Sequence, residues 1–303
     1  MATPAAWAAG SKVTPPSGPQ FIIAALTMLD RQGRFDDSLN KDYLAFLAEG
    51  GADGVLVLGT TGEFSSFSVR ERKQILESGL RHKGRLSVMC QVGTPNLPET
   101  LELLAHAASA GAGSALVLPP FYYKNPSLDG LVAFYEPILE AAKIPVYLYN
   151  IPQLSGVPIP AELLARLARY EKLAGIKDSY SKADAMRAFL REFPKLKILT
   201  GVPANMAVNL REGGAGAITG NGSVLLRESV AIFAAHRNAG DVEAAQQRFN
   251  EAAAGLAGYT GIPEMKYALG RMGLRESPCR PPFAALSSAK KGEIDQRIAR
   301  RRG

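Results

Sequence analysis

Lys177 stands near the end of a short apolar run, LAGIKDS at 173–179. Lysine is rarely buried unless it is paired, so this one either surfaces as a strand ends or is placed for chemistry. In a strand, Gly175 and Ser179 share the face of Lys177, whereas Asp178 lies on the other face. An apolar enclosure would favour the neutral amine, which attacks a carbonyl carbon to form an imine. We expect Gly175 to leave room for the lysine stem.

Tyr149 ends a second apolar run, PVYLYNIP at 145–152. A tyrosine in a core strand is most often a packing residue. Beside an imine-forming lysine, its phenol could instead carry protons to and from the substrate. Both interpretations remain open from this segment alone.

A glycine-rich turn, GTTGEF at 59–64, follows another apolar run. Turns of this kind are common, so the turn by itself is weak evidence for a site. Thr60 and Thr61 nevertheless supply two hydroxyls and exposed backbone N–H groups. Such converging donors suit a small carboxylate.

Eight short apolar runs must position these residues, and the segments between them have helical spacing. The runs cover 21–29, 54–60, 86–93, 114–120, 145–152, 173–179, 197–203 and 216–222. Continuous hydrophobic strands that alternate with helices indicate a parallel sheet covered by helices. Eight units predict an α/β fold, the (β/α)8 TIM barrel, whose active site lies at the C-terminal ends of the strands. An open doubly wound sheet is the alternative, but the glycine-rich dinucleotide turn typical of it does not follow the first run.

Three regions are expected along the 303 residues. Residues 1–20, rich in Ala, Pro, Ser and Gly, are predicted to be a mobile tail. Residues 21–240 would form the barrel, and 241–303 a C-terminal helical extension. Helices are expected near 224–258, 263–273 and 287–301, packed on the barrel or on a neighbouring subunit.

The formal net charge of +7 raises the question of nucleic acid. The basic residues are spread along the expected helices, and the densest cluster, at 297–302, accompanies no nucleic-acid motif. We therefore expect no nucleic-acid partner, and an anionic substrate is equally consistent with the charge. No run approaches the roughly 18 apolar residues of a membrane span. Two lone cysteines and no convincing signal peptide favour a cytoplasmic protein.

A metal or other cofactor is not expected. The only histidines are His82, His106 and His236. None of them stands at an expected strand end or in the spacing of metal ligands.

Six motifs, in this order and spacing, resemble the dihydrodipicolinate synthase / N-acetylneuraminate lyase superfamily of pyruvate-dependent class I aldolases. The resemblance covers roughly Gln20 to the C-terminus. The motifs are GTTGE (59–63), PPFYYKNPS (119–127), YNIPQLSGVPIP (149–160), GIKDS (175–179), GAGAITGNGSV (214–224) and CRPPF (279–283).

The resemblance implies a catalytic group of four residues. Lys177 would be the Schiff-base lysine and Tyr149 the central acid and base. Thr60 or Thr61, with Tyr123, would form a proton relay with that tyrosine. In the family the second tyrosine often comes from a neighbouring subunit, which implies an oligomer, commonly a homotetramer built as a dimer of dimers.

The resemblance also implies a substrate-binding group. Thr61 and its loop, which includes Gly59, would hold the pyruvate carboxylate. Backbone carbonyls near Gly201 and Ile218 would line the pocket, and Ser179 lies on the lysine face of its strand.

Two departures from the family bear on the substrate. Dihydrodipicolinate synthases place an arginine five positions after the central tyrosine, where this chain has Leu154. Neuraminate lyases carry an acidic pair shortly after the seventh strand, where this chain has Pro203 and Ala204. A charge-assisted contact of roughly 1.5–3 kcal/mol would be missing without the arginine.

The leading hypothesis is therefore reversible aldol cleavage of a 2-keto-3-deoxy or 4-hydroxy-2-oxo acid to pyruvate and an aldehyde. The alternatives are a dihydrodipicolinate synthase, which condenses pyruvate with aspartate semialdehyde, and a keto-deoxy-sugar-acid dehydratase. A non-catalytic paralogue that binds a keto acid is a further alternative, which an intact Lys177 and Tyr149 pair disfavours.

Overall fold

The computed structural model describes residues 18–180, 183–256 and 261–302. Residues 1–17 of the expected mobile tail therefore lie outside the described residues. Gln20, the last residue of that expected tail, already belongs to the first strand and pairs with Gly216 of the last one.

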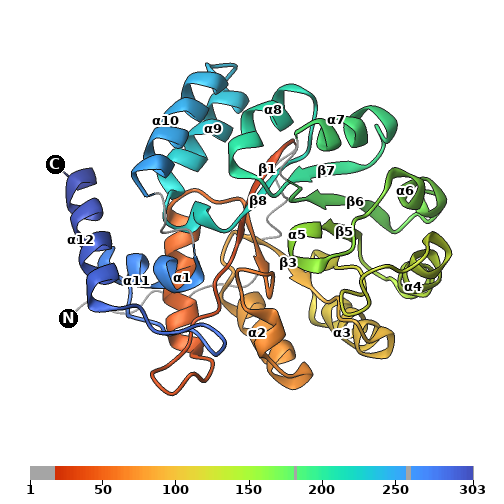
Figure 1. Ribbon diagram of the computed structural model, residues 1–303, viewed down its shortest axis with the longest axis horizontal. Coiled ribbons are helices and arrows are strands. Elements are labelled where there is room, and N and C mark those ends of the chain that lie inside the picture. Colours follow the sequence, from red (N-terminus) through yellow and green to blue (C-terminus); the bar gives the residue numbers. More distant parts are fainter. Residues whose placement is uncertain (1–17, 181–182, 257–260, 303) are drawn as a thin grey trace, which may run out of the picture.

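Eight parallel strands close into a barrel in which β1 pairs with both β2 and β8 (Figure 1). This confirms the predicted (β/α)8 barrel and excludes the open sheet. Each strand coincides with one of the eight apolar runs, although most strands end earlier than their run. The strands are β1 (Gln20–Ala24), β2 (Gly54–Val57), β3 (Ser87–Gln91), β4 (Ser114–Val117), β5 (Val146–Asn150), β6 (Leu173–Asp178), β7 (Lys197–Thr200) and β8 (Gly216–Thr219).

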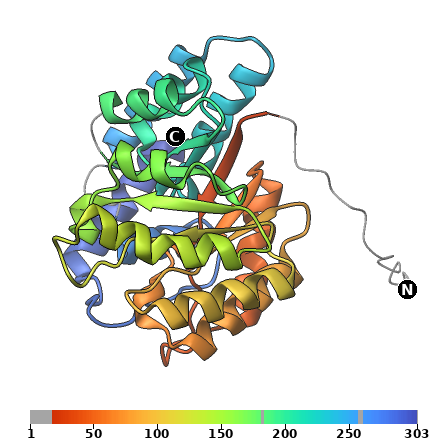
Figure 2. The ribbon, with the colours of Figure 1, turned by 90° about the vertical axis from the view of Figure 1, so that its right-hand side faces the viewer.

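Helices surround the barrel on its outside, as Figure 1 and Figure 2 show from two directions. Several begin at a side-chain cap; in α2, for example, Ser68 and Glu71 form a reciprocal capping box. The helices between strands are α1 (Asp37–Glu49), α2 (Val69–His82), α3 (Leu97–Ala110), α4 (Leu128–Ala141), α5 (Pro152–Ser155), α6 (Ala161–Leu167), α7 (Ala183–Glu192) and α8 (Met206–Arg211).

Short 3-10 turns follow β2, β7 and β8 at the barrel mouth, the end of the barrel at which the strands have their C-terminal ends. They are η1 (Phe64–Ser66), η2 (Pro203–Asn205) and η3 (Asn221–Ser223).

The alternation of side chains along the strands creates two apolar regions. One lies between the barrel wall and the helices. The other fills the barrel interior, and it is made of Ile22, Ala24, Leu56, Met89, Leu116, Leu118, Tyr147, Tyr149, Ile151, Leu199 and Ile218. These side chains fill the interior of the barrel. The place for a ligand is therefore at the C-terminal ends of the strands.

The C-terminal part departs from the expectation at one point. The helix expected over 224–258 is two helices, α9 (Leu226–Arg237) and α10 (Val242–Gly255). Ala239 has a left-handed φ of 52°, and the Asp241 side chain accepts a hydrogen bond from Ala244 N to begin the second helix. The segment HRNAGD at 236–241 thus contains a turn and a new N-cap.

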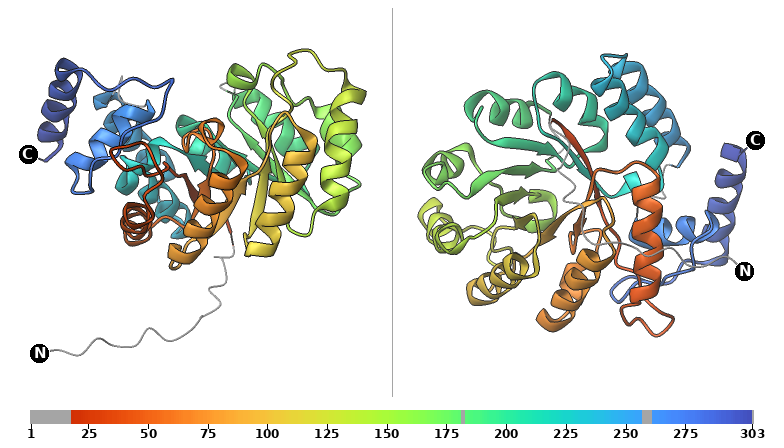
Figure 3. Two further views of the ribbon diagram at one scale, coloured as in Figure 1. Left: turned by 90° about the horizontal axis from the view of Figure 1, so that it is seen from below. Right: turned by 180° about the vertical axis from the view of Figure 1, so that it is seen from behind.

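Two more helices follow, α11 (Ile262–Arg271) and α12 (Ser288–Arg302). They lie outside the ring, beside α1 (Figure 3). The predicted C-terminal helical part is thus present.

Candidate active site

Lys177 and Tyr149 are direct neighbours at the C-terminal ends of β6 and β5. Their Cα atoms are partners in the parallel register, and Lys177 Nζ lies 4.1 Å from the centroid of the Tyr149 ring. The two residues are only 3% and 2% exposed. A lysine surfacing as its strand ends would be solvated, so that interpretation of Lys177 is wrong.

Gly201, rather than Gly175, leaves space for the lysine stem. A Cβ at Gly201 would meet Lys177 Cε at 3.2 Å and Ser179 Oγ at 1.9 Å. A Cβ at Gly175 would instead meet the backbone oxygen of Lys197 at 2.0 Å. The expectation for Gly175 is therefore wrong: it permits close approach of β6 to β7, whereas Gly201 borders the site.

The Tyr149 hydroxyl has three polar partners, which come from two segments, the turn after β2 and the end of β6. It hydrogen-bonds Thr60 Oγ1 at 3.4 Å and also interacts with Lys177 and Ser179. Burial, the largest single influence, raises the pKa of Tyr149. The Lys177 charge and the hydrogen bonds from Thr60, Lys177 and Ser179 together outweigh it, so the pKa lies below its ordinary value. The phenol therefore releases its proton more readily than an ordinary tyrosine.

The GTTGEF turn carries Thr60 and Thr61 from the end of β2 into the barrel mouth. Two non-glycine residues with left-handed backbone, Leu58 (φ 60°) and Glu63 (φ 56°), bracket it. Thr61 Oγ1 lies 2.5 Å from where a Cβ of Gly220 would be, so the turn meets the end of β8. A residue with a side chain at 220 would displace this threonine.

The remaining predicted residues divide into two groups. Gly59 belongs to the turn, and Ile218 of β8 faces the barrel interior and is 1% exposed. By contrast, Tyr123 and Leu154 are 78% and 62% exposed. Tyr123 packs edge-on against Tyr122, and no contact of it with the buried pair is found in the part of the chain that the structure describes.

Asn150 and Asp178 form a polar pair on the outer face of β5 and β6, at the C-terminal ends of both strands. The sequence analysis did not predict this pair. Asn150 Nδ2 donates to Asp178 Oδ1 (2.7 Å), and its Oδ1 accepts from Ile159 N (3.0 Å). Burial raises the pKa of Asp178 to about 6, despite hydrogen bonds from Asn150 and Tyr180 N that lower it. Alternation along the strand correctly placed Asp178 on the face away from Lys177. The sequence alone did not show that Asn150 of β5 is the partner of Asp178.

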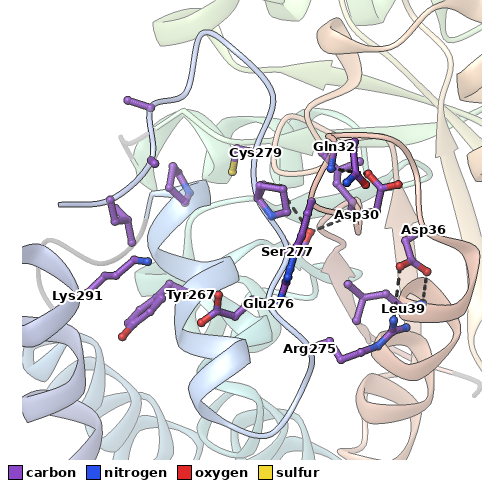
Figure 4. Close-up of a pocket in the computed structure, with 17 residues that line it drawn as sticks. Asp30, Gln32, Asp36, Leu39, Tyr267, Arg275, Glu276, Ser277, Cys279 and Lys291 are labelled. Atoms are coloured by element: carbon purple, nitrogen blue, oxygen red, sulfur yellow. Dashed lines mark hydrogen bonds and ion pairs between the residues drawn. The ribbon is translucent and has the colours of Figure 1, made fainter. Parts of the chain in front are cut away.

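A cavity of about 740 Å³ lies elsewhere, between the β1–α1 loop and the C-terminal segment. Figure 4 shows acidic, basic and aromatic side chains around it, among them Asp30, Tyr267, Arg275 and Lys291. It contains none of the predicted site residues, and its mixed charges indicate no single class of ligand. Burial is also the main reason that the pKa of Cys279 there is raised to about 12, which keeps the thiol protonated.

Within residues 18–180, 183–256 and 261–302, no three His, Cys, Asp or Glu side chains are grouped to hold a metal ion. No helix in the same ranges is long and apolar enough to cross a membrane.

A closed (β/α)8 barrel with a buried lysine beside a tyrosine at its strand ends is the arrangement expected of a Schiff-base aldolase. The family model described as the dihydrodipicolinate synthetase family matches residues 19–301. The chain belongs to this family, and it is a pyruvate-dependent class I aldolase or lyase.

Named relatives point to more than one reaction. A DapA-like lyase of Chloroflexus aurantiacus is 38% identical, covering 89% of this chain and 93% of its own. A 4-hydroxy-tetrahydrodipicolinate synthase of Hyphomonas neptunium is 32% identical (91% and 96% covered). A probable 2-dehydro-3-deoxy-D-pentonate aldolase of Escherichia coli is 30% identical (87% and 91% covered).

Among solved structures, YagE, a prophage protein from E. coli K12, was determined in complex with pyruvate. It superimposes with a TM-score of 0.87 at 27% identity, and covers 93% of this chain and 98% of its own.

Proposed function

We propose that this enzyme reversibly cleaves a 2-keto-3-deoxy or 4-hydroxy-2-oxo acid into pyruvate and an aldehyde, with Lys177 as the nucleophile. The observation that carries the proposal is the buried Lys177 Nζ, 4.1 Å from the centre of the Tyr149 ring. Its neighbour there is Tyr149, through the ring and the hydroxyl, and lysine is rarely buried without an ionic partner, so its burial among the strand ends calls for an explanation. Imine formation with a keto acid explains it.

The reaction follows from this pair. The neutral Lys177 amine attacks the C2 carbonyl of the keto acid to form a carbinolamine. Tyr149 gives the carbinolamine hydroxyl the proton with which it leaves as water, so that an iminium ion and a Tyr149 phenolate remain. Tyr149 as phenolate takes the proton from the C4 hydroxyl, the C3–C4 bond breaks, and the aldehyde leaves. The bonding electrons move into the iminium, which becomes an enamine. Protonation at C3 and hydrolysis then release pyruvate and restore the lysine.

Thr60 and Thr61 would serve the carboxylate and the proton path. Thr60 hydrogen-bonds the Tyr149 hydroxyl, so it can pass a proton to or from the phenol. The turn of Gly59 and Thr61 offers backbone N–H groups to the pyruvate carboxylate. The pyruvate complex of YagE supports pyruvate as the keto acid that binds here.

Tyr123 would complete the site of a neighbouring subunit. An exposed tyrosine pair on the β4–α4 loop suits a contact between subunits, where aromatic residues are enriched. We therefore propose a homotetramer, built as a dimer of dimers.

We also propose a cytoplasmic location, because Cys90 and Cys279 are both free.

Leu154 favours the aldolase over the synthase. Its apolar side chain stands where the synthases carry an arginine for a second carboxylate, and it offers no charge. One observation keeps the synthase as a second candidate: Lys124 Nζ donates to Ser155 O (3.1 Å) and Phe121 O (2.6 Å). This ammonium lies beside the Leu154 loop and could bind an anionic aldehyde.

The test is a screen for pyruvate release. The purified enzyme would be incubated with keto-deoxy pentonates, hexonates and 4-hydroxy-2-oxo acids, and pyruvate measured by coupled oxidation of NADH. We expect release from at least one of these acids, abolished by Lys177→Ala. Efficient condensation with aspartate semialdehyde, and no release from any keto acid, would replace the proposed reaction by that of the synthase.

A further inference from the structure

Glu63 is a buried acid in the turn that carries Thr60 and Thr61. Its side chain is 0% exposed and its backbone is left-handed, with a φ of 56°. A left-handed conformation is unfavourable for a residue with a side chain, and it persists where the surroundings hold it. The contacts that hold Glu63 therefore also fix the shape of the turn.

Those contacts come from the C-terminal helical extension, about 200 residues away in the chain. Lys266 of α11, 1% exposed at its side chain, places Nζ 2.6 Å from Glu63 Oε1. The same Nζ donates to Pro278 O at 2.6 Å. Arg280 N donates to Glu63 Oε2 at 2.9 Å. Both carboxylate oxygens thus face donors from the extension.

The Arg280 side chain ties the segment around the turn together. Its guanidinium donates to Gly33 O (2.8 Å), Ser66 O (2.7 Å) and Glu71 Oε1 (2.6 Å). It also lies 4.4 Å from the centre of the Phe67 ring. One residue of the extension therefore reaches both sides of η1.

Ser277, three residues before Arg280, also bonds to the barrel. Ser277 Oγ accepts a hydrogen bond from Leu29 N at 2.8 Å, and Ser277 is seen against the β1–α1 loop in Figure 4. The segment 277–280 is consequently fixed to the barrel along its length.

We infer that Glu63, Lys266 and Arg280 are positioning residues, which set the geometry of the turn that receives the pyruvate carboxylate. This inference rests on the proposed role of Thr60 and Thr61. A buried ion pair loses in desolvation much of what it gains by attraction, so stability alone explains it poorly. Holding a strained turn two residues from Thr61 explains it better. The extension is then part of the catalytic apparatus.

The test compares pyruvate binding with stability in two matched double variants. Glu63→Gln/Lys266→Met removes the buried pair without leaving one charge alone. The control, Asp53→Asn/Arg237→Met, removes an ion pair at the opposite end of the barrel, where Asp53 also accepts from Phe21 N. For each, we would measure the thermal midpoint and the pyruvate concentration that half-saturates borohydride trapping at Lys177.

We expect the half-saturating concentration to rise about tenfold or more in the Glu63 variant, with an adduct still formed at saturation. The control should lose stability but keep the wild-type value within about twofold. Equal half-saturation in wild type and the Glu63 variant would show that the pair acts on stability alone and would overturn the inference. If that variant does not fold, Arg280→Lys replaces it, because lysine keeps the charge but cannot reach all three acceptors; an unchanged half-saturation there would equally overturn it. An absence of trapping in wild type would instead overturn the proposed function, and the inference with it.

Discussion

Asn150 and Asp178 are bonded at 2.7 Å, each one residue beyond a member of the Tyr149 and Lys177 pair. The bonded pair lies on the outer face of the strands, and Tyr149 and Lys177 lie on the inner face. Their hydrogen bond therefore fixes the two strand ends relative to one another. It does so from a position that no substrate reaches.

Asp178→Asn should change how stability depends on pH. Burial raises the pKa of Asp178 to about 6, above the ordinary 3.8 of the unfolded chain. Its contribution is therefore fully present below about pH 4 and is lost as pH rises through 6. Asparagine keeps the acceptor for Asn150 and carries no charge. The variant should gain about 1–3 kcal/mol relative to wild type between pH 4 and pH 7, measured by urea unfolding. A difference independent of pH would contradict this.

Tyr149→Phe should lower turnover by about 100-fold or more, because it removes the proton carrier and keeps the ring. The buried ring should preserve the fold, so the thermal midpoint should change little. Steady-state kinetics of pyruvate release would measure the loss. Turnover equal to wild type would mean that Tyr149 only packs.

Gly201→Ala should slow trapping of pyruvate about tenfold or more. The new methyl would overlap Ser179 Oγ and press on Lys177 Cε, so the lysine would have to move. Gly292→Ala is the matched control, since a Cβ there meets nothing within 4 Å. If both variants trap pyruvate at the wild-type rate, Gly201 does not define the space around the lysine.

Leu154→Arg should raise efficiency with aspartate semialdehyde by about ten- to a hundredfold, the equivalent of roughly 1.5–3 kcal/mol. Leu154 is 62% exposed, so the substitution should cost little stability. Kinetics with aspartate semialdehyde and with the keto acid found by the release screen would be measured in one preparation. No gain with the semialdehyde would show that a residue such as Lys124 already binds its carboxylate.

The barrel was predictable because each strand is a short apolar run between helical segments, which is a local property. The inner positions of Lys177 and Tyr149 followed from alternation along their strands. The break at Ala239 was missed although the polar segment 236–241, HRNAGD, carries Gly240 and the N-cap residue Asp241. The role of Gly175 was assigned wrongly because a strand's own sequence does not say what the neighbouring strand places against it.

Contacts distant in sequence were not predictable in this way. Glu63 meets Lys266 across about 200 residues, and no spacing rule connects them. The partner of Tyr123 cannot be found within one chain if it lies in a neighbouring subunit. Family motifs contain Glu63 and Tyr123 but not Lys266, and only the folded arrangement relates Glu63 to Lys266 and places Tyr123 at the surface.

The most direct test of the central claim is borohydride reduction in the presence of pyruvate, followed by peptide mass spectrometry. We expect one reduced pyruvate adduct, on Lys177 and on no other lysine, which is absent from Lys177→Ala. An unmodified wild-type protein, or an adduct that persists in Lys177→Ala, would contradict it.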